Sequence, residues 1–422
     1  MSTLAFDTNL ADPDLLPTQN GPPHDLFHQW RASDPVHWNP PNEAYQSTMP
    51  GASIEKGFWV LTRYQDVFDV SRNQELFSSH DGGPIIWDFE PERLAIQQMG
   101  LMGMPSDQHA AIKRLVMPPF SPKNLTPFED EIKAVARQIV DDVAQKGECE
   151  FVFDIASRLP VYTFCKIMGI PDDMREQVFT LGNTLADTEN PKGYEEEEEA
   201  TAMFQTFAIC EELCAQKRQK PDGSILSSLV HAADDGNQLE QMQINMFFLT
   251  VAIAGHETTR GTVGHFIRLM NENPEQYELL KSDPEKYLPN AIEEVLRYAP
   301  PVIKFRRTAT QDTKIGAQEI KQGDKIYLSY PAANRDPEVF EDPDKFDILR
   351  DNASKHLSFG TGPHVCLGAR LAQMQMKAML TEILTRIPDM APSGTIENPL
   401  RSIWFHTILN MPVRFTPEKK AA

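Results

Sequence analysis

Cys366 is the residue whose type and surroundings point most directly to chemistry. It lies in the glycine-rich segment 359–368, F-G-T-G-P-H-V-C-L-G, and residues 367–374 favour helix. The sulfur is therefore expected at a helix N-terminus, where the helix dipole and unpaired backbone N–H groups favour thiolate over thiol. The glycines allow the backbone to approach a flat group closely or to turn with a positive φ. A thiolate that is open on one side in such a loop is suited to bind a metal ion.

Haem iron matches a ligand of this kind, because an axial thiolate donates electron density toward the O–O bond of bound oxygen. The pattern F-G-x-G-x-H-x-C-x-G resembles the haem-binding loop of the cytochrome P450 family, the haem-thiolate monooxygenases. The resemblance implies haem b as the cofactor, Cys366 as the ligand of its iron, and Phe359 and Gly360 as residues in contact with it. The remaining cysteines are expected to be small buried hydrophobic residues: Cys149, Cys165, Cys210 and Cys214.

Residues 239–270 form the longest apolar stretch, and the pattern is apolar on most sides, which predicts a buried central helix. At about 1.5 Å per residue this helix would be roughly 48 Å long, enough to cross the molecule. Its middle, 254–259, reads A-G-H-E-T-T and is small and polar. Glycine and threonine are poor helix formers, and a threonine hydroxyl can bond the i−4 carbonyl and bend the helix. A bent central helix with a buried acid beside a hydroxyl needs an explanation.

Two chemical interpretations of this segment compete. A zinc-protease H-E-x-x-H motif fails, because Arg260 stands where the second histidine ligand should be. The segment is similar to the A-G-x-E-T-T element of cytochromes P450. That resemblance implies that Thr258 positions water and oxygen, that Glu257 relays protons, and that Ala254 and Gly255 leave space for dioxygen against the cofactor. The structural alternative is that Thr258 only bends the helix.

Glu294 and Arg297 stand three residues apart, on one face of a predicted helix. Such a pair is weak evidence by itself, because many surface helices carry one. The order of motifs gives it weight: the pair resembles the E-x-x-R of the same family, and Arg350 matches the third member of that charge cluster. The resemblance implies a structural role, in which the cluster braces the loop that carries Cys366.

Haem carries two carboxylates, so the protein should supply cations and hydrogen-bond donors for them. Within the cysteine loop, His364 matches a propionate ligand of the family. Arg307 matches the arginine on the strand after the E-x-x-R helix, but the neighbouring Arg306 leaves the register open by one residue.

A third propionate position lies near residue 109. The segment 109–114, H-A-A-I-K-R, resembles the family's H-x-x-x-R, with His109 as its first residue and Lys113 in place of the arginine. Lysine keeps the charge but loses the bidentate fork. Either Lys113 binds the propionate as a point charge, or Arg114 takes part; for each of these positions a plain surface cation is the alternative.

Composition limits the classes of function. The formal net charge of −21 argues against binding to nucleic acid or anionic membranes. The sequence contains no run of 18 apolar residues, so no membrane span is predicted, and the N-terminus lacks the pattern of a signal peptide. Five cysteines without paired spacing indicate no disulfide framework, so we expect a cytoplasmic protein in a reducing compartment. The acidic run 195–199 is typical of a solvated face or loop.

The predicted elements are mostly helices. Residues 58–62 read as a strand and 80–105 as a long functional loop. Helices are expected over 65–77, 106–117, 127–146, 156–168 and 172–186, and after the acidic run to about residue 218. The resemblance covers nearly the whole chain and implies a mainly α fold. That fold is a helical prism with a long central helix and a smaller β-rich lobe, one domain over 1–422, with 1–26 as an extended, poorly regular segment.

The implied reaction inserts one oxygen atom from O2 into a C–H bond, using two protons and two electrons. The expected electron source is a [2Fe–2S] ferredoxin with its reductase. That donor would dock on a basic patch near the thiolate, and we expect a monomer. The patch would consist of Lys113, Arg114, Lys123, Lys355, Arg370 and Lys377. Alternatives are an H2O2-driven peroxygenase, a non-catalytic haem or ligand-binding protein, and a helical protein without haem.

The expected substrate pocket is apolar and partly aromatic, with few charge partners, which fits an uncharged hydrophobic compound. Resemblance favours a terpenoid, a sterol side chain or a branched lipid, with aromatic hydrocarbons as the alternative. The expected wall residues lie in the long loop, on the central helix and in two later segments: Ile85, Ile86, Trp87, Phe89, Leu101, Met102, Val251, Ala254, Pro301, Val302, Ile303, Ile403, Trp404 and Phe405.

Overall fold

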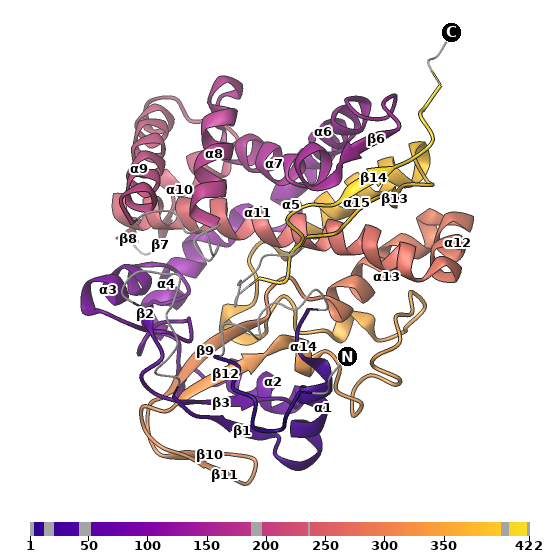
Figure 1. Cartoon of the computed structure of the whole chain (residues 1–422). Coiled ribbons are helices and arrows are strands. Elements are labelled where there is room, and N and C mark those ends of the chain that lie inside the picture. Colours follow the sequence, from indigo (N-terminus) through magenta and orange to yellow (C-terminus); the bar gives the residue numbers. More distant parts are fainter. Residues whose placement is uncertain are drawn as a thin grey trace.

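The computed structural model describes residues 4–11, 21–41, 52–186, 196–234, 237–397 and 405–419. The long central helix is confirmed: α11 (Gln241–Glu272) is continuous over 32 residues and runs through the middle of the molecule (Figure 1). Within it, the Thr258 hydroxyl donates to the Ala254 carbonyl at 2.7 Å, the i−4 bond expected from the sequence. The helix nevertheless stays continuous through 254–259.

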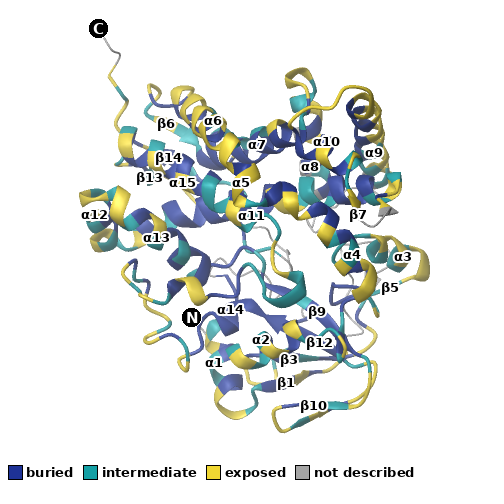
Figure 2. Ribbon diagram, turned by 180° about the vertical axis from the view of Figure 1, so that it is seen from behind, coloured by how far each residue is buried: buried dark blue, intermediate teal, exposed yellow. Residues whose placement is uncertain are grey.

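Most other helices pack around α11 and share one large hydrophobic core with it (Figures 1 and 2). Figure 2 shows buried residues along the central helices and in the sheet, and exposed residues on the outer surfaces. The helices of this part are α4 (Ser106–Val116), α5 (Pro122–Leu125), α6 (Glu129–Asp141), α7 (Arg158–Met168), α8 (Arg175–Ala186), α9 (Glu196–Gln219), α10 (Ile225–Val230), α12 (Pro274–Ser282), α13 (Pro284–Tyr298) and α15 (Ala369–Arg386).

The smaller lobe is built on a five-stranded sheet of order β1-β3-β12-β9-β4. Strands β3 and β12 pair in parallel and the other neighbours are antiparallel. Helices α1 (His24–Ser33), α2 (Tyr64–Arg72) and α14 (Tyr330–Ala333) lie beside this sheet (Figure 1). The strands are β1 (Val36–Asn39), β3 (Phe58–Leu61), β4 (Phe77–Ser78), β9 (Lys304–Ala309) and β12 (Lys325–Ser329).

Four smaller sheets complete the strands that the structure describes. Three are two-stranded ribbons and one has three strands, so the mainly α prediction with a small β-rich lobe is confirmed. The ribbons pair β10 (Thr313–Ile315) with β11 (Gln318–Ile320), β2 (Ala52–Ser53) with β5 (Asp88–Phe89), and β7 (Ala233–Asp234) with β8 (Asn237–Gln238). The three-stranded sheet has the order β13 (Ala391–Pro392), β14 (Pro412–Arg414) and β6 (Glu148–Glu150).

The long-loop prediction for 80–105 was wrong in part, because the segment contains β5 and a helix, α3 (Pro91–Met99). None of the residues of α3 is buried, and its apolar residues Leu94, Ile96 and Met99 do not form the i, i+3, i+4, i+7 stripe by which a helix is recognised. Helix α2 ends at Arg72, five residues before the expected end, where the Asn73 side chain accepts the Leu76 N–H and favours a turn.

The N-terminal segment is irregular up to α1, whereas most of the acidic run is helical. Residues 4–11 and 21–23 carry no helix or strand, and α1 begins at His24. Helix α9 begins inside the acidic run, at Glu196, with Glu197 and Glu198 exposed; residue 195 lies outside the described residues. Among the described helices, none is both long and apolar enough to cross a bilayer.

His265 gives α11 a pH-dependent contribution to stability. It is 1 % exposed, and burial, reinforced by His406 and Arg268, holds its pKa well below 6.5. The ring is neutral: Nδ1 accepts from Arg268 Nε at 3.3 Å and Nε2 donates to the His406 carbonyl at 3.1 Å. Because only the unfolded chain takes up this proton, the stabilisation is complete above pH 6.5 and falls below it.

We expect His265→Gln to reduce the pH dependence of the free energy of unfolding by about 1.4 kcal/mol per pH unit below pH 6. Urea unfolding followed by circular dichroism between pH 5 and 7.5 measures this slope. A variant with the same slope as the parent protein would contradict the neutral assignment.

Candidate haem-thiolate active site

The cysteine loop connects the β-rich lobe to α15. Cys366 N–H donates to the Phe359 carbonyl at 2.8 Å, and Gly360 and Gly362 have φ values of 67° and 70°. A side chain on Gly362 would lie 2.9 Å from the backbone of α2, so this position requires glycine for close approach as well as for its φ. The loop is therefore folded tightly back on itself and held against α2.

The sulfur of Cys366 lies at the N-terminus of α15, where the sequence placed it. The backbone N–H groups of Gly368 and Ala369 lie close enough to the sulfur to lower the pKa of the thiol. Burial within the chain raises the pKa of this thiol, whereas the two N–H groups and Lys113 act in the opposite direction. The residue is still exposed on one side, so it combines an open face with donors that favour the thiolate.

Four basic side chains gather beside the loop: His109 and Lys113 from α4, Arg307 from β9 and His364 from the loop itself. The rings of His109 and His364 lie 4.2 Å apart between centroids. Burial and then Lys113 and Arg307 lower the pKa of His109 to about 4. Burial, followed by Arg307, His109 and Lys113, lowers the pKa of His364 to about 2. We call these four residues the basic cluster.

The basic cluster fits the two carboxylates of haem. None of the charged groups that shift the pKa values of its two histidines is a carboxylate. The Arg307 side chain is 3 % exposed, and its Nε has no hydrogen-bond partner among the described residues. Two anionic groups with acceptor oxygens would balance these charges and satisfy that donor.

The sequence left two choices open, Arg306 or Arg307 and Lys113 or Arg114, and the surroundings of these side chains differ. Arg306 points away from the basic cluster: its Nη1 donates to the Trp87 carbonyl at 2.9 Å and lies 3.7 Å from Asp88. Adjacent residues of β9 face opposite sides, so Arg307 is the one on the side of the cluster. The Lys113 ammonium donates to the carbonyls of Pro363 and Val365 in the loop, whereas Arg114 is exposed.

The central helix presents two different faces at the predicted catalytic segment. Ala254 and Gly255 are exposed, and a side chain on Gly255 would meet nothing within 4 Å. Glu257 is 2 % exposed and forms a buried ion pair with Arg260, one turn further along α11. Sequence reasoning used Arg260 only to exclude zinc, although its i, i+3 spacing from Glu257 could have indicated the pair.

A cavity of about 400 Å³ lies next to Thr258, large enough for a small hydrophobic molecule. Of the expected wall residues, Ile85, Met102, Ala254, Val302 and Phe405 line it. Ile86 and Trp87 are 2 % and 1 % exposed and belong to the core of the sheet lobe. Ile303 is also buried, and Val251 packs against the main core. Further lining residues are Leu185, Met203, Met246, Leu249, Thr250, Ile253 and Phe305; the expected wall residues Ile403 and Trp404 lie outside the described residues.

Sequence reasoning missed the contribution of α3 to the cavity. Three polar residues of this helix, Glu92, Arg93 and Gln97, line the wall, together with Ile96.

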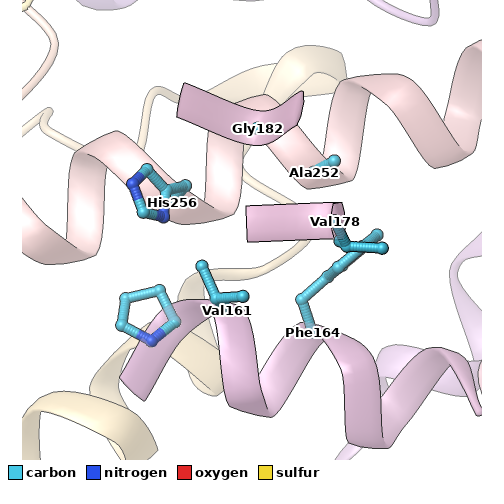
Figure 3. A pocket seen from close by; sticks show the side chains of 7 residues that line it. Val161, Phe164, Val178, Gly182, Ala252 and His256 are labelled. Atoms are coloured by element: carbon cyan, nitrogen blue, oxygen red, sulfur yellow. The ribbon is translucent and has the colours of Figure 1, made fainter. Parts of the chain in front are cut away.

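A separate cavity of about 20 Å³, with room for one water, lies beside His256 and is lined by residues of α7, α8 and α11 (Figure 3). Its wall residues are Pro160, Val161, Phe164, Val178, Gly182, Ala252 and His256.

The structure brings Glu294, Arg297 and Arg350 together. Arg297 forms a two-point ion pair with Glu294, with N–O distances of 2.7 and 2.8 Å, and both residues are 0 % exposed. Arg350 Nε lies 3.2 Å from the same carboxylate. Arg297 also donates to the Asn334 carbonyl at 2.9 Å, and Asn334 in turn bonds Leu357 and Ser358 just before the cysteine loop.

A cysteine-bearing loop beside a long central helix, with cations that fit two carboxylates, is the arrangement expected of a haem-thiolate monooxygenase. The chain belongs to the cytochrome P450 family, whose model matches residues 192–402. It is 33 % identical to a steroid C26-monooxygenase of Mycolicibacterium smegmatis over 95 % of this chain and 92 % of the relative. It is 31 % identical to the linalool 8-monooxygenase of Pseudomonas putida over 90 % of this chain and 92 % of that protein.

Solved structures agree with this assignment. A cytochrome P450 of Mycobacterium marinum in complex with pseudoionone superposes with a TM-score of 0.84 at 33 % identity, covering 93 % of this chain and 94 % of that one. A cytochrome P450 of Bacillus megaterium in complex with testosterone gives a TM-score of 0.80 at 27 % identity, covering 93 % and 99 %. The protein is therefore a monooxygenase that uses haem b and O2.

Proposed function

We propose that this monooxygenase hydroxylates an uncharged hydrophobic compound, a terpenoid, a sterol side chain or a branched lipid. The observation that carries the proposal is the largely apolar cavity that meets α11 at Ala254 and Thr258. Relatives named for steroid and linalool oxidation, and solved structures holding pseudoionone and testosterone, support the same substrate class. Difference spectra recorded against terpenoids, sterols and aromatic hydrocarbons test it, and a preference for aromatic hydrocarbons would contradict it.

Cys366 holds the iron in this proposal, and the basic cluster holds the two carboxylates of haem. The bound haem supplies the activation of O2, which the side chains of the protein cannot perform. The chain contributes the donors at the sulfur, from Gly368 and Ala369, and the cations that fix the position of the cofactor. We further propose that residues 1–422 form one domain and that the protein acts as a cytoplasmic monomer; the described cysteines are all free thiols, which supports a reducing compartment.

Thr258 and Glu257 have separate tasks. The Thr258 hydroxyl borders the cavity and is oriented by its bond to the Ala254 carbonyl, so it can position a water next to a bound substrate. Glu257 is buried behind this surface and its charge is balanced by Arg260. To deliver a proton to Thr258, the carboxylate must turn away from Arg260, so the ion pair controls the relay.

We propose a [2Fe–2S] ferredoxin as the electron donor, bound where exposed cations border the cysteine loop. Arg114, Lys123, Arg370 and Lys377 are exposed on α4, α5 and α15. Arg370 and Lys377 lie close enough to Glu129 of α6 to contribute to the lowering of its pKa. On a chain with a net charge of −21, cations on this side offer an acidic donor a favourable approach.

Cys366→His is expected to abolish the strongly red-shifted Soret band of the reduced carbonyl complex, because that band requires thiolate ligation. The variant need not lose haem, since the basic cluster stays intact. Absorption spectra under carbon monoxide measure the effect, with Cys165→Ala as the matched control for a buried cysteine. If Cys165→Ala lost the band and Cys366→His kept it, Cys366 would not be the ligand.

Thr258→Ala is expected to uncouple electron use from oxidation, because a water would no longer be held beside the substrate. Product formed per reduced nicotinamide should fall and peroxide should rise, whereas Glu257→Gln should slow turnover by about 100-fold. Thr258→Ser restores the hydroxyl and serves as the control. Unchanged coupling in Thr258→Ala would contradict the role of this residue.

The rate of the first electron transfer from a ferredoxin is expected to fall about tenfold as salt is raised, because exposed charges are screened. Charge reversal at Lys123 and Lys377 should have a similar effect at low salt, measured by stopped-flow reduction under carbon monoxide. Lys314→Glu, in the β10–β11 ribbon, is the control. Rates that do not respond to salt or to charge reversal would remove this docking model.

A further inference from the structure

The carboxylate of Glu293 contacts both ends of the cysteine loop. Glu293 lies on α13, next to the buried Glu294. Its Oε2 is 3.1 Å from His356 Nε2, before the loop, and its Oε1 accepts from Gln373 Nε2 at 2.6 Å, after the loop. One side chain of α13 thus joins two segments that lie on either side of Cys366 in the sequence.

His356 transmits this contact to the start of the loop. Its ring is 2 % exposed, and its Nδ1 accepts the Ser358 backbone N–H at 3.1 Å, so Nε2 carries the proton donated to Glu293. The ring also lies 5.7 Å from that of Phe359, whose carbonyl accepts the Cys366 N–H. The orientation of His356 is therefore coupled to the backbone that faces Cys366.

Gln373 transmits the contact to the other end. It lies on the second turn of α15, the helix whose N-cap residue Gly368 and first residue Ala369 have their N–H groups near the sulfur. A shift of α15 along its axis would change both of those donor distances. The bond from Gln373 to Glu293 ties this helix to α13 close to its N-terminus.

We infer that Glu293 is a positioning residue for the thiolate: with His356 and Gln373 it holds the two ends of the loop at a fixed separation. This keeps Cys366 within reach of the N–H groups that stabilise its charged form. The inference rests on the proposed role of Cys366 as the iron ligand. It differs from the Glu294–Arg297 cluster, whose bonds to the Asn334, Pro343 and Lys345 carbonyls and to Arg350 all lie before the loop.

Hydrogen-bond chemistry separates two substitutions at this position. In Glu293→Gln the amide oxygen can accept from His356 while the amide N–H group donates to a reoriented Gln373, so both ties survive without the charge. Glu293→Ala removes both ties. A positioning role therefore predicts that glutamine preserves the thiolate and alanine does not.

The experiment uses the haem-loaded full chain and measures the carbonyl complex of the reduced protein. In Glu293→Ala, conversion from the thiolate-type spectrum to the thiol-type spectrum on mild heating should be about a hundredfold faster, roughly tenfold for each of the two lost hydrogen bonds to a charged acceptor. The haem reduction potential, from spectroscopic titration, should shift in the same variant. Glu293→Gln should stay near the parent protein in both measurements.

Gln373→Ala is the second variant, because a half-buried residue of α15 can be truncated with little effect on folding. It should give a smaller acceleration, and adding it to Glu293→Ala should have no further effect, since the tie is already absent. Glu285→Ala, an exposed glutamate of the same helix, is the matched control and should behave as the parent protein.

The outcomes are distinguishable. A parent protein without a thiolate-type spectrum would overturn the proposed function. A parent protein with that spectrum and a Glu293→Ala variant that converts at the same rate would overturn only the positioning role. Equal impairment in Glu293→Gln and Glu293→Ala would also overturn it, because charge rather than the two hydrogen bonds would then be responsible.

Discussion

The buried ion pair between Glu294 and Arg297 is the interaction on which the rest of the site depends. Both side chains are 0 % exposed, and such a pair is retained only when its remaining hydrogen-bonding groups are satisfied. Arg350 and the carbonyls of the segment before the cysteine loop satisfy them here. The same helix, α13, packs on α11 and α15, so a charge pair in the core fixes the relative positions of the loop, the central helix and the helix behind the sulfur.

The features that the sequence predicted well carry a local signal. The long apolar stretch predicted α11, and a cysteine before a run of helix-forming residues predicted a sulfur at a helix N-terminus. Features that depend on tertiary contacts could not be predicted from the sequence. An apolar residue looks the same in a cavity wall and in a core, so Ile86 and Trp87 were expected in the wall although they are buried in the sheet lobe. Strand alternation shows that Arg306 and Arg307 face opposite sides but not which side faces the basic cluster.

The two faces of α11 give neighbouring residues different electrostatic surroundings. Thr258 borders the cavity, whereas Glu257 lies in the protein interior against Arg260. A buried carboxylate without a partner would be strongly destabilising, so Arg260 allows the charged acid to stay in the interior; in the proposed proton relay the same ion pair would have to open before a proton moves. Adjacent helix residues do not face each other, so the sequence implied that the acid and the hydroxyl point in different directions. It could not show which of the two borders the cavity and which is buried.

The absence of buried residues from α3 has a consequence beyond the shape of the cavity. A helix with no residue in the core can open locally at a small free energy, whereas α11 on the opposite wall cannot open without loss of the core. Substitutions in α3 therefore cost little global stability while they change the polar part of the cavity wall. Natural variation can consequently alter which molecules this enzyme accepts without affecting the elements that hold the sulfur, so its substrate range is free to evolve faster than its chemistry.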